Sequence, residues 1–325
     1  MNLVKPLVLY SGGILIIALV GSFCLSVGRY NISFIDVLYC LVGQGDETQS
    51  NIIFSFRLPR IILAIVIGAG LSAAGVAFQS LFRNPLATPD ILGVTSGVSF
   101  GAVLGLLLGL SIGYISFVGF IFGLASLALV VLIGYNKNMP YETTSMILSG
   151  IIIGALFQSL IGICKYVADP QDTLPSITYW LLGSLDTYVI WSLVGIMLGI
   201  GVIFILRWKL NLLMLQDDEA ISLGVNLPLL RVLSIFASTM IVACAISVCG
   251  VIGWVGLLVP HIARLIVGND TSKIVPLSLF IGALFLVVVD TFSRTMSASQ
   301  IPISILTSLF GAPFFIYILR KSKRS

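Results

Sequence analysis

Charged residues are scarce in this sequence. Aspartate, glutamate, lysine and arginine make up 9% of its 325 residues, while 58% are hydrophobic and the mean hydropathy is +1.13. A soluble domain carries roughly a quarter charged residues, so the composition argues against a soluble protein and predicts an all-α, polytopic membrane helix bundle. No charge-rich or low-complexity segment is long enough to fold separately, and we expect one transmembrane domain over residues 1–325.

Residues that carry common chemistry are also missing. The chain has no Gly-x-x-x-x-Gly-Lys-Ser/Thr loop to cradle phosphates, which argues against ATP hydrolysis within it. Its five cysteines lack paired ligand spacing and are interpreted as small apolar residues within spans. The single histidine, His261, has no acidic or cysteine neighbour to complete a metal site, so we interpret it as a packed or capped residue. We expect no metal, no cofactor and no enzymatic activity, and no nucleic-acid partner, because the net charge of +4 is attributed to membrane topology.

Long runs without any charge dominate the chain. About 20 residues at ~1.5 Å each cover the hydrocarbon core of a bilayer, so such runs predict membrane-spanning helices. The 46 residues of 91–136 are enough for two spans with a turn near 110–116. The 32 residues of 232–263 are ambiguous, and Gly250, Gly253 and Pro260 favour a break there. The eight uncharged windows are 6–28, 61–82, 91–136, 143–164, 187–206, 232–263, 274–289 and 295–319.

The placement of lysine and arginine decides between nine and ten spans. Ten spans put 12 of the 17 basic residues inside, whereas nine spans put ten there, so the positive-inside rule predicts ten spans with both termini cytoplasmic. The outside segments are then 29–60, 165–186 and 290–301, and the inside segments are 83–90, 137–142, 207–231 and 264–273. The inside basic residues are Lys5, Arg83, Lys137, Arg207, Lys209, Arg231, Arg264, Lys273, Arg320, Lys321, Lys323 and Arg324.

Three local patterns add detail. Gly93, Gly97, Gly101, Gly105 and Gly109 recur at every fourth position and predict a bare helical stripe onto which another helix packs closely. In the inside loop 207–231, residues 216–224 predict a short helix with acidic residues in its first turn and a glycine at its end. In the outside loop 165–186, residues 176–185 predict a short amphipathic helix after a proline-containing turn, with Trp180 as an interfacial anchor.

A set of short motifs occurs in a defined order along nearly the whole chain. They are RLPR at 57–60, RNPLATP at 83–89 with ILGV at 91–94, WLLGS at 180–184, DEA at 218–220 with LGV at 223–225, GVIGWVGL at 250–257, PHIAR at 260–264, then Asp290, Arg294, IPI at 301–303 and GAPF at 311–314. This ordered set closely resembles the FecCD family, the permease subunits of ATP-binding-cassette (ABC) importers for iron-siderophores, haem and cobalamin. Trp254 departs from the family, which usually shows phenylalanine there.

The resemblance implies an assembly in the bacterial cytoplasmic membrane. It implies a homodimer (or pseudo-dimer) of permease subunits, with one translocation pathway at the subunit interface. Two ATPase subunits would dock in the cytoplasm, and an extracytoplasmic substrate-binding protein would deliver the cargo. Membrane lipid surrounds the spans.

The resemblance also implies a docking role for three outside arginines, Arg57, Arg60 and Arg294. The arginine fork holds a carboxylate in two hydrogen bonds, which suits acidic sockets on a binding protein. The alternative is that these side chains anchor helix ends at the membrane interface. Asp290 and Arg294 lie four residues apart, so an intrahelical ion pair is a further explanation for both.

The inside helix is the expected contact with the ATPase. The resemblance favours a coupling helix over a merely solvated loop, with Arg264 as a further cytoplasmic contact, and Pro260 and His261 are assigned to a helix break. The acidic triplet cannot converge on one metal ion, because consecutive helical residues splay around the axis. The predicted coupling residues are Gln216, Asp217, Asp218, Glu219, Ala220, Leu223, Gly224 and Arg264.

The span 143–164 resembles the helix that lines the pathway in this family, which makes Ser145, Ser149 and Gln158 candidate lining residues; helix-to-helix hydrogen bonding is the alternative. The chain is therefore predicted to pass a bulky metal chelate, with an oxyanion such as molybdate as the alternative cargo. An ion-coupled secondary transporter would need acidic or histidine groups at membrane depth, and a membrane enzyme would need a catalytic cluster there. The uncharged windows contain no acidic residue and no such cluster, their one histidine, His261, is interpreted as packed or capped, and Asp290 lies at a span edge.

Overall fold

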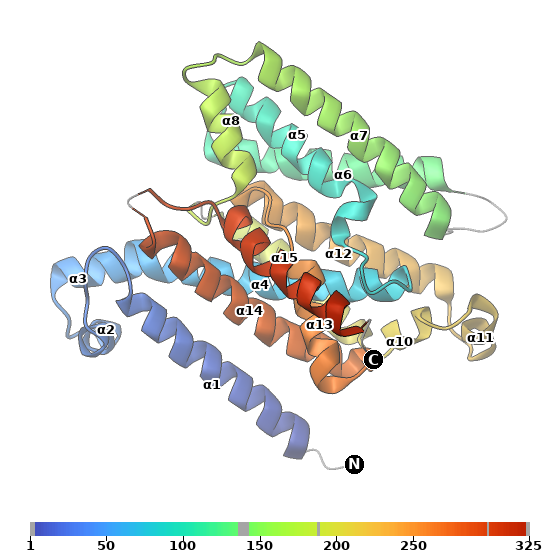
Figure 1. Cartoon of the computed structure of the whole chain (residues 1–325), viewed down its shortest axis with the longest axis horizontal. Coiled ribbons are helices and arrows are strands. Elements are labelled where there is room, and N and C mark those ends of the chain that lie inside the picture. The colour runs from blue at the N-terminus through green and yellow to red at the C-terminus, as the bar shows by residue number, and fades with distance from the viewer. Residues whose placement is uncertain (1–3, 136–142, 187–188, 298, 323–325) are drawn as a thin grey trace.

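The computed structural model describes residues 4–135, 143–186, 189–297 and 299–322, and within these ranges it is helical and contains no strand (Figure 1). The longer helices are α1 (Val4–Ser26), α4 (Leu58–Leu81), α5 (Val94–Leu107), α6 (Ile112–Gly134), α7 (Thr143–Val167), α9 (Ile190–Leu206), α12 (Leu227–Cys249), α13 (Val255–Val267), α14 (Thr271–Thr295) and α15 (Ile303–Ser322). The shorter ones are α2 (Phe34–Leu41), α3 (Glu47–Asn51), the π-helical turn η1 (Ile52–Arg57), the 3₁₀ turn η2 (Pro89–Leu92), α8 (Thr173–Leu182), α10 (Leu210–Leu213) and α11 (Asp217–Ser222).

The uncharged windows correspond to the apolar helices. Five helical segments of the described chain are long and apolar enough to cross a membrane, and five further apolar helices are shorter. α5 has 14 residues and α13 has 13, which at ~1.5 Å per residue is less than the ~30 Å of a hydrocarbon core. The bundle is thus of the polytopic membrane type, while the count of ten spans and the cytoplasmic termini stay predictions. Lys137, Lys323 and Arg324, which entered that count, lie outside the described residues.

The two predicted interruptions are present. α5 and α6 are separated by a turn at 108–111, and α12 and α13 by a link at 250–254 that includes Gly250 and Gly253. Gly250 has φ +68°, and a Cβ there would overlap the Trp180 carbonyl oxygen, so the link requires glycine. The assignment of Pro260 and His261 to this break is wrong: both lie inside α13. Pro260 cannot donate to the carbonyl of Gly256, and the Gln79 side chain of α4 approaches that oxygen at 3.5 Å instead.

The glycine stripe packs α5 against α6, as predicted. A Cβ on Gly97 would lie 2.7 Å from Ser126 Cβ, and one on Gly101 would lie 2.7 Å from the Val118 carbonyl oxygen. The stripe is shorter than the sequence pattern, because Gly93 and Gly109 adopt φ values of +67° and +65° just outside the helix. Gly109 serves a turn only, whereas Gly93 also packs on α7, because a Cβ there would lie 2.9 Å from the Gly150 carbonyl oxygen.

Polar side chains gather at the two ends of the bundle. At one end, here called the Arg60 end, the last turn of α1, the start of α4 and the end of α14 meet. At the other, here called the α11 end, the end of α4 meets α10, α11 and the start of α12. α2 and α3 lie toward the Arg60 end, and the two chain termini lie toward the side of α10 and α11 (Figure 1).

The link from α4 to α5 does not stay at the α11 end, as the sequence predicted for 83–90. Arg83 lies there, but Pro89 packs next to Gly256, which in turn contacts Leu71 near the middle of α4. The carbonyl of Gly93 accepts a hydrogen bond from Ser126, near the middle of α6. The link therefore turns back into the bundle, which is why α5 can be as short as 14 residues.

Candidate functional site

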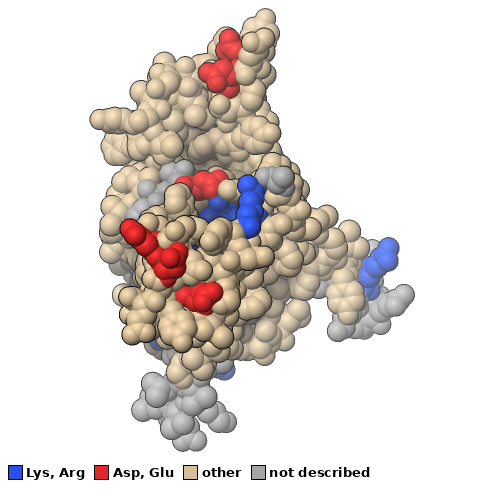
Figure 2. All heavy atoms as spheres, turned by 90° about the vertical axis from the view of Figure 1, so that its left-hand side faces the viewer, with Lys and Arg blue, Asp and Glu red and all other residues tan. Residues whose placement is uncertain are grey.

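The three arginines predicted for docking lie around one cavity at the Arg60 end. The cavity has a volume of about 460 Å³, and Arg57, Arg60 and Arg294 line it together with Asp186 and Gln300. Figure 2 looks onto this end and shows basic and acidic side chains side by side near its middle. The tertiary structure thus brings together residues from η1, α4, α14 and the two loops that precede α9 and α15.

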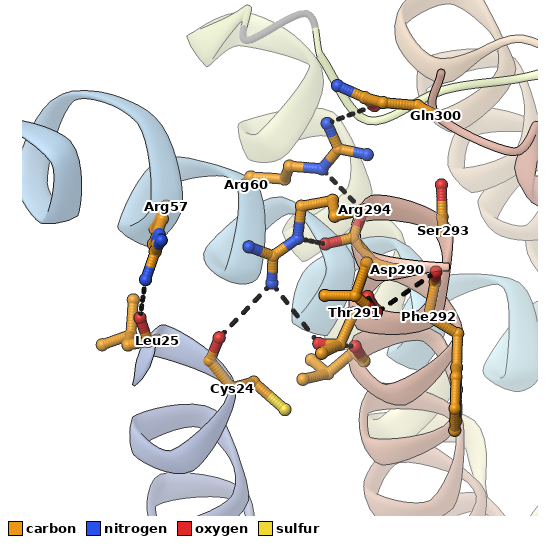
Figure 3. A network of polar contacts seen from close by, with 12 residues as sticks. Cys24, Leu25, Arg57, Arg60, Asp290, Thr291, Phe292, Ser293, Arg294 and Gln300 are labelled. Carbon is orange, nitrogen blue, oxygen red and sulfur yellow. Dashed lines mark hydrogen bonds and ion pairs between the residues drawn. The ribbon is translucent and has the colours of Figure 1, made fainter. Parts of the chain in front are cut away.

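Arg57 is held by the backbone of the neighbouring helix. Its guanidinium donates to the carbonyls of Leu25 at 2.6 Å, Ser26 at 3.3 Å and Tyr30 at 2.6 Å, and the residue is only 6% exposed (Figure 3). A positive charge at this place satisfies carbonyls that the end of α1 leaves without helical partners. Gly28 makes room for it, since a Cβ there would lie 2.6 Å from a guanidinium nitrogen.

Asp290 joins the other two arginines. Its carboxylate accepts from Arg60 Nε at 2.6 Å and from Arg294 Nε at 3.0 Å, and its side chain is fully buried (Figure 3). The ion pair expected between Asp290 and Arg294 is therefore present, but it is part of a larger network. Arg60 also pairs with Asp186 and donates to Gln300 Oε1 at 2.8 Å.

Asp186, Gln300 and Arg29 were missed by the sequence reasoning. Asp186 ends the predicted outside segment 165–186 and Gln300 lies in the predicted outside segment 290–301, where a polar residue is expected, and only the fold places them opposite Arg60. Arg29 lines the same cavity, is exposed, and donates to the Ser297 carbonyl at 3.3 Å. It is thus the arginine of this cavity that is most accessible to a partner, whereas Arg57 and Arg60 are less than 10% exposed.

The short helix predicted at 216–224 is present as α11, which begins one residue later and ends two residues earlier than predicted. The Gln216 backbone N–H donates to the Glu219 carboxylate at 3.3 Å, and Gly224, with φ +77°, ends the helix. Gln216, Asp218, Glu219, Leu223 and Gly224 are exposed. Ala220 is fully buried against the bundle, so its side chain is not available to a partner.

Asp217 is partly exposed to solvent but points toward two arginines of the bundle. Its carboxylate pairs with Arg83 and accepts from one Arg231 nitrogen at 2.8 Å on both oxygens. Partial burial raises the pKa of the Asp217 carboxyl, but the hydrogen bonds and charges of Arg83 and Arg231 outweigh it, so the pKa lies below its ordinary value. Arg83 holds this position in a left-handed backbone conformation, φ +49°, which costs a residue with a side chain about 1–2 kcal/mol.

Arg264, predicted to contact the ATPase, is half-buried and donates to Gln79 Oε1. The same Gln79 lies 3.5 Å from the Gly256 carbonyl, so one side chain links Arg264 with the acceptor next to Pro260. His261 lies 5.6 Å, between ring centroids, from Phe315 of α15. No group of three or more potential metal ligands occurs among the described residues.

The three residues predicted to line the pathway differ in exposure. Gln158 is exposed on α7, and its Nε2 donates to Ser96 Oγ of α5 at 3.2 Å. Ser145 is half-buried, and Ser149 is only 4% exposed at the contact of α7 with α6. In this conformation Gln158 is the one that presents a polar group to the surface of α7.

The short helix predicted in the loop 165–186 is present as α8, which begins at Thr173, three residues before the predicted start, and has Pro175 in its first turn. Trp180 is partly buried and packs against the core, so it does not lie on the exposed face expected of an interfacial anchor. It lines a second cavity of about 450 Å³, which shares Asp186 and Gln300 with the first.

Comparison with known proteins agrees with the motif order. Residues 14–321 match the model of the FecCD transport family. The molybdate import system permease protein MolB of Haemophilus influenzae is 39% identical over 98% of this chain and 97% of its own length. A probable iron chelatin transport system permease protein of Helicobacter pylori is 39% identical over 85% of each chain. A solved structure, described as an inward-facing conformation of a metal-chelate type ABC transporter, superposes with a TM-score of 0.88 at 39% identity, covering 96% of this chain and 99% of that one.

Proposed function

Because the chain belongs to the FecCD transport family, and is an ABC importer permease of that type, we propose that two copies of it pass an iron chelate across the bacterial cytoplasmic membrane. The cargo would be a ferric siderophore or a related chelate such as haem. ATP would be hydrolysed by a separate ATPase subunit, and a separate binding protein would deliver the cargo from the outside.

The observation that carries this proposal is the segregation of charge. Ion pairs occupy the Arg60 end and the α11 end, and the apolar helices between them supply a conduit without a phosphate-binding loop of its own. A conduit of this kind needs partners at both ends: one that gives it cargo and one that moves it.

At the Arg60 end we place the binding protein. Arg57, Arg60 and Arg294 surround the cavity, and Arg29 lies exposed beside them. The basic groups outnumber Asp186 and Asp290, so the cavity attracts acidic side chains on a docking surface. Arg57 and Arg60 are hydrogen-bonded within the chain, which makes them supports of the docking surface, while Arg29 supplies its accessible charge.

At the α11 end we place the two ATPase subunits, one on each copy of the permease. Exposed Ile221 and Leu223 on the outward side of α11 give an apolar contact, and Asp218 and Glu219 give a charged one. Arg264 donates a hydrogen bond to Gln79, so we propose that it holds α13 against α4 in addition to contacting the ATPase.

The pathway is proposed to run past η2 and α7. Asp90 lies on η2, is exposed, and accepts a hydrogen bond from Thr95 although it lies deep in the bundle. A carboxylate at that depth cannot face lipid, so it faces water or a second subunit. In this arrangement Asp90 would be an acidic group at membrane depth, in contrast to the expectation from the uncharged windows. Asp90 is the one titratable residue that lines the small cavity beside it. A proton relay needs a chain of titratable groups, so this cavity does not support one.

The cargo can be tested directly. MolB and the Helicobacter protein are each 39% identical to this chain over the residues aligned, so the percentage of identity does not separate an oxyanion from a chelate. We expect vesicles that contain the permease, its ATPase and its binding protein to accumulate a ferric siderophore or haem when ATP is present, and not molybdate. Accumulation without the ATPase would contradict the proposal, and accumulation of molybdate alone would replace the chelate with the oxyanion.

A further inference from the structure

The end of α4 is closed in an unusual way. The Asn84 N–H donates to the Gln79 carbonyl at 3.1 Å and the Arg83 N–H to the Ser80 carbonyl at 3.3 Å, which is the double bond of a Schellman motif. The central position of that motif is left-handed and strongly favours glycine, but Arg83 occupies it with φ +49°. A side chain is therefore present where the backbone alone would prefer none.

The Arg83 side chain connects α4 to the segment that carries α11. Its Nε donates to the Leu213 carbonyl at the end of α10 at 2.9 Å, and its terminal nitrogen pairs with Asp217. Asp217 is the first residue of α11, and it also accepts from Arg231 in the first turn of α12. One carboxylate thus joins three helices, and Arg231 is only 11% exposed where it does so.

α11 depends on such attachments for its orientation. It has six residues, it is flanked by non-helical links, and Ala220 is its one buried residue. An isolated helix of this length is unstable in water, so packing and ion pairs must fix it. A single small buried side chain leaves the helix free to pivot, whereas a second attachment at Asp217 fixes its direction relative to α4 and α12.

We propose that Asp217, held by Arg83 and Arg231, is a positioning residue that transmits a movement of α11 to α4 and α12. The inference rests on the proposed function, because it assumes that an ATPase subunit moves α11. α4 is one uninterrupted helix with Arg60 at its opposite end, so the attachment at Asp217 also connects α11 to the cavity where the binding protein is placed. Asp217 thereby acts through the bundle, while Asp218 and Glu219 remain exposed for the ATPase.

Arg83→Gly provides a discriminating test, because glycine suits the left-handed position while removing the ion pair. We expect this variant to be as stable to heat as the wild type and to bind the ATPase equally well, but to take up about tenfold less cargo per ATP hydrolysed in proteoliposomes. Asp217→Asn should show the same loss of coupling, and Asp217→Glu should restore part of it. Lys273→Gln, which removes an exposed ion pair with Asp270 at the same end, is the matched control and should keep the wild-type ratio.

A cross-link supplies the second readout. The paired variant Arg83→Cys with Asp217→Cys should be uncoupled when reduced and regain coupling when the two thiols are joined by a bifunctional thiol reagent about as long as an arginine side chain, because a covalent link then replaces the ion pair that Arg83 makes through its terminal nitrogen. A wild-type ratio of uptake to ATP hydrolysis in Arg83→Gly, or loss of ATPase binding in Asp217→Asn, would overturn the positioning role. If the wild-type complex transports neither ferric chelate nor molybdate, the proposed function fails. The positioning role is then tested separately by spin labels on Ser222 and Leu86. The distribution of distances between the two labels should broaden in Asp217→Asn, and an unchanged distribution would overturn the inference.

Discussion

Arg60 and Asp290 are 230 residues apart in the sequence, yet Arg60 Nε donates to the Asp290 carboxylate at 2.6 Å, and the Asp290 side chain has no exposure to solvent. The pair ties α4 to α14 at the Arg60 end, and the carboxylate is shared with Arg294. Arg294 thus depends on this buried acid for the balance of its charge, whereas Arg60 also pairs with Asp186.

Asp290→Ala should strongly destabilise the protein. It would leave Arg60 and Arg294 partly buried without their shared counter-ion, and removing one partner of a buried ion pair costs about 3–5 kcal/mol. Thermal unfolding in detergent checks this, with Lys273→Gln as a control, because an exposed pair contributes roughly 0–1 kcal/mol. Equal unfolding temperatures for the two variants would show that the ion-pair network around Asp290 does not contribute to the stability of the fold.

Gly75→Ala should disrupt the contact between α4 and α13. A Cβ at Gly75 would overlap the backbone carbonyl of Gly256, which cannot move aside as a flexible side chain can. Overpacking of this kind costs about 1–3 kcal/mol. Gly201→Ala in α9 is the matched control, because a Cβ there meets nothing within 4 Å, and it should be neutral or stabilising by up to about 1 kcal/mol. Thermal unfolding of both variants measures the difference, and a stable Gly75→Ala would contradict the close approach.

Arg29→Glu should weaken docking of the binding protein without weakening the fold. Arg29 is exposed and makes one long hydrogen bond, so reversing its charge mainly changes the field at the cavity. We expect about a tenfold lower affinity and a slower, less salt-dependent association, measured by surface binding to permease in nanodiscs. Arg57→Gln is the contrasting variant: it should lower the unfolding temperature, because α1 loses the donor to Leu25 and Tyr30. A binding defect in Arg57→Gln with an unchanged unfolding temperature would restore Arg57 as a direct docking residue.

The attachment of α11 should weaken at low pH. The pKa of Asp217 is lower in the folded chain than its ordinary value of 3.8, so its ion pairs contribute full stability above about pH 3.8 and lose it as the pH falls through the lower folded value. The difference in unfolding temperature between wild type and Asp217→Asn should therefore be constant from pH 7 to 5 and shrink below pH 4. A difference that grows on acidification would have the wrong sign for a depressed pKa.

Asp90→Cys should react with a charged, membrane-impermeant thiol reagent. The five native cysteines are buried, so background labelling should be low. Leu198→Cys, on the exposed and apolar surface of α9, is the control for a site that faces lipid or a second subunit. Labelling at position 90 alone would support an aqueous pathway beside η2, whereas equal protection of both cysteines would place Asp90 at a dry interface.

Much of this protein could be predicted from local features of the sequence. Runs such as 61–82 and 143–164 are long, mainly apolar and without charge, and in a bilayer a helix satisfies their backbone polar groups internally. Gly97 and Gly101 were recognisable as a packing stripe because the four-residue period is a property of the helix itself. The acidic first turn and the final Gly224 predicted α11 for the same reason, because helix caps depend on neighbours in the sequence. The resemblance to the family likewise followed from the order of short local motifs.

What the sequence could not determine depends on distances between segments. Pro260 looked like a helix end, but α13 continues through it because Gln79 and Gly75 of α4 surround the carbonyl that the proline leaves without a donor. Asp90 looked like part of a surface loop, and only the packing of Pro89 on Gly256 shows that the link turns inward.

Charge placement divides in the same way. The sequence by itself determined that the arginines lie near helix ends, because charges are excluded from the apolar runs. Only the tertiary structure decided that Arg57 binds the carbonyl end of α1, that Arg60 and Arg294 share Asp290, and that Asp217 joins Arg83 to Arg231. An ion pair forms wherever folding brings two groups within about 4 Å, and no local pattern records that meeting.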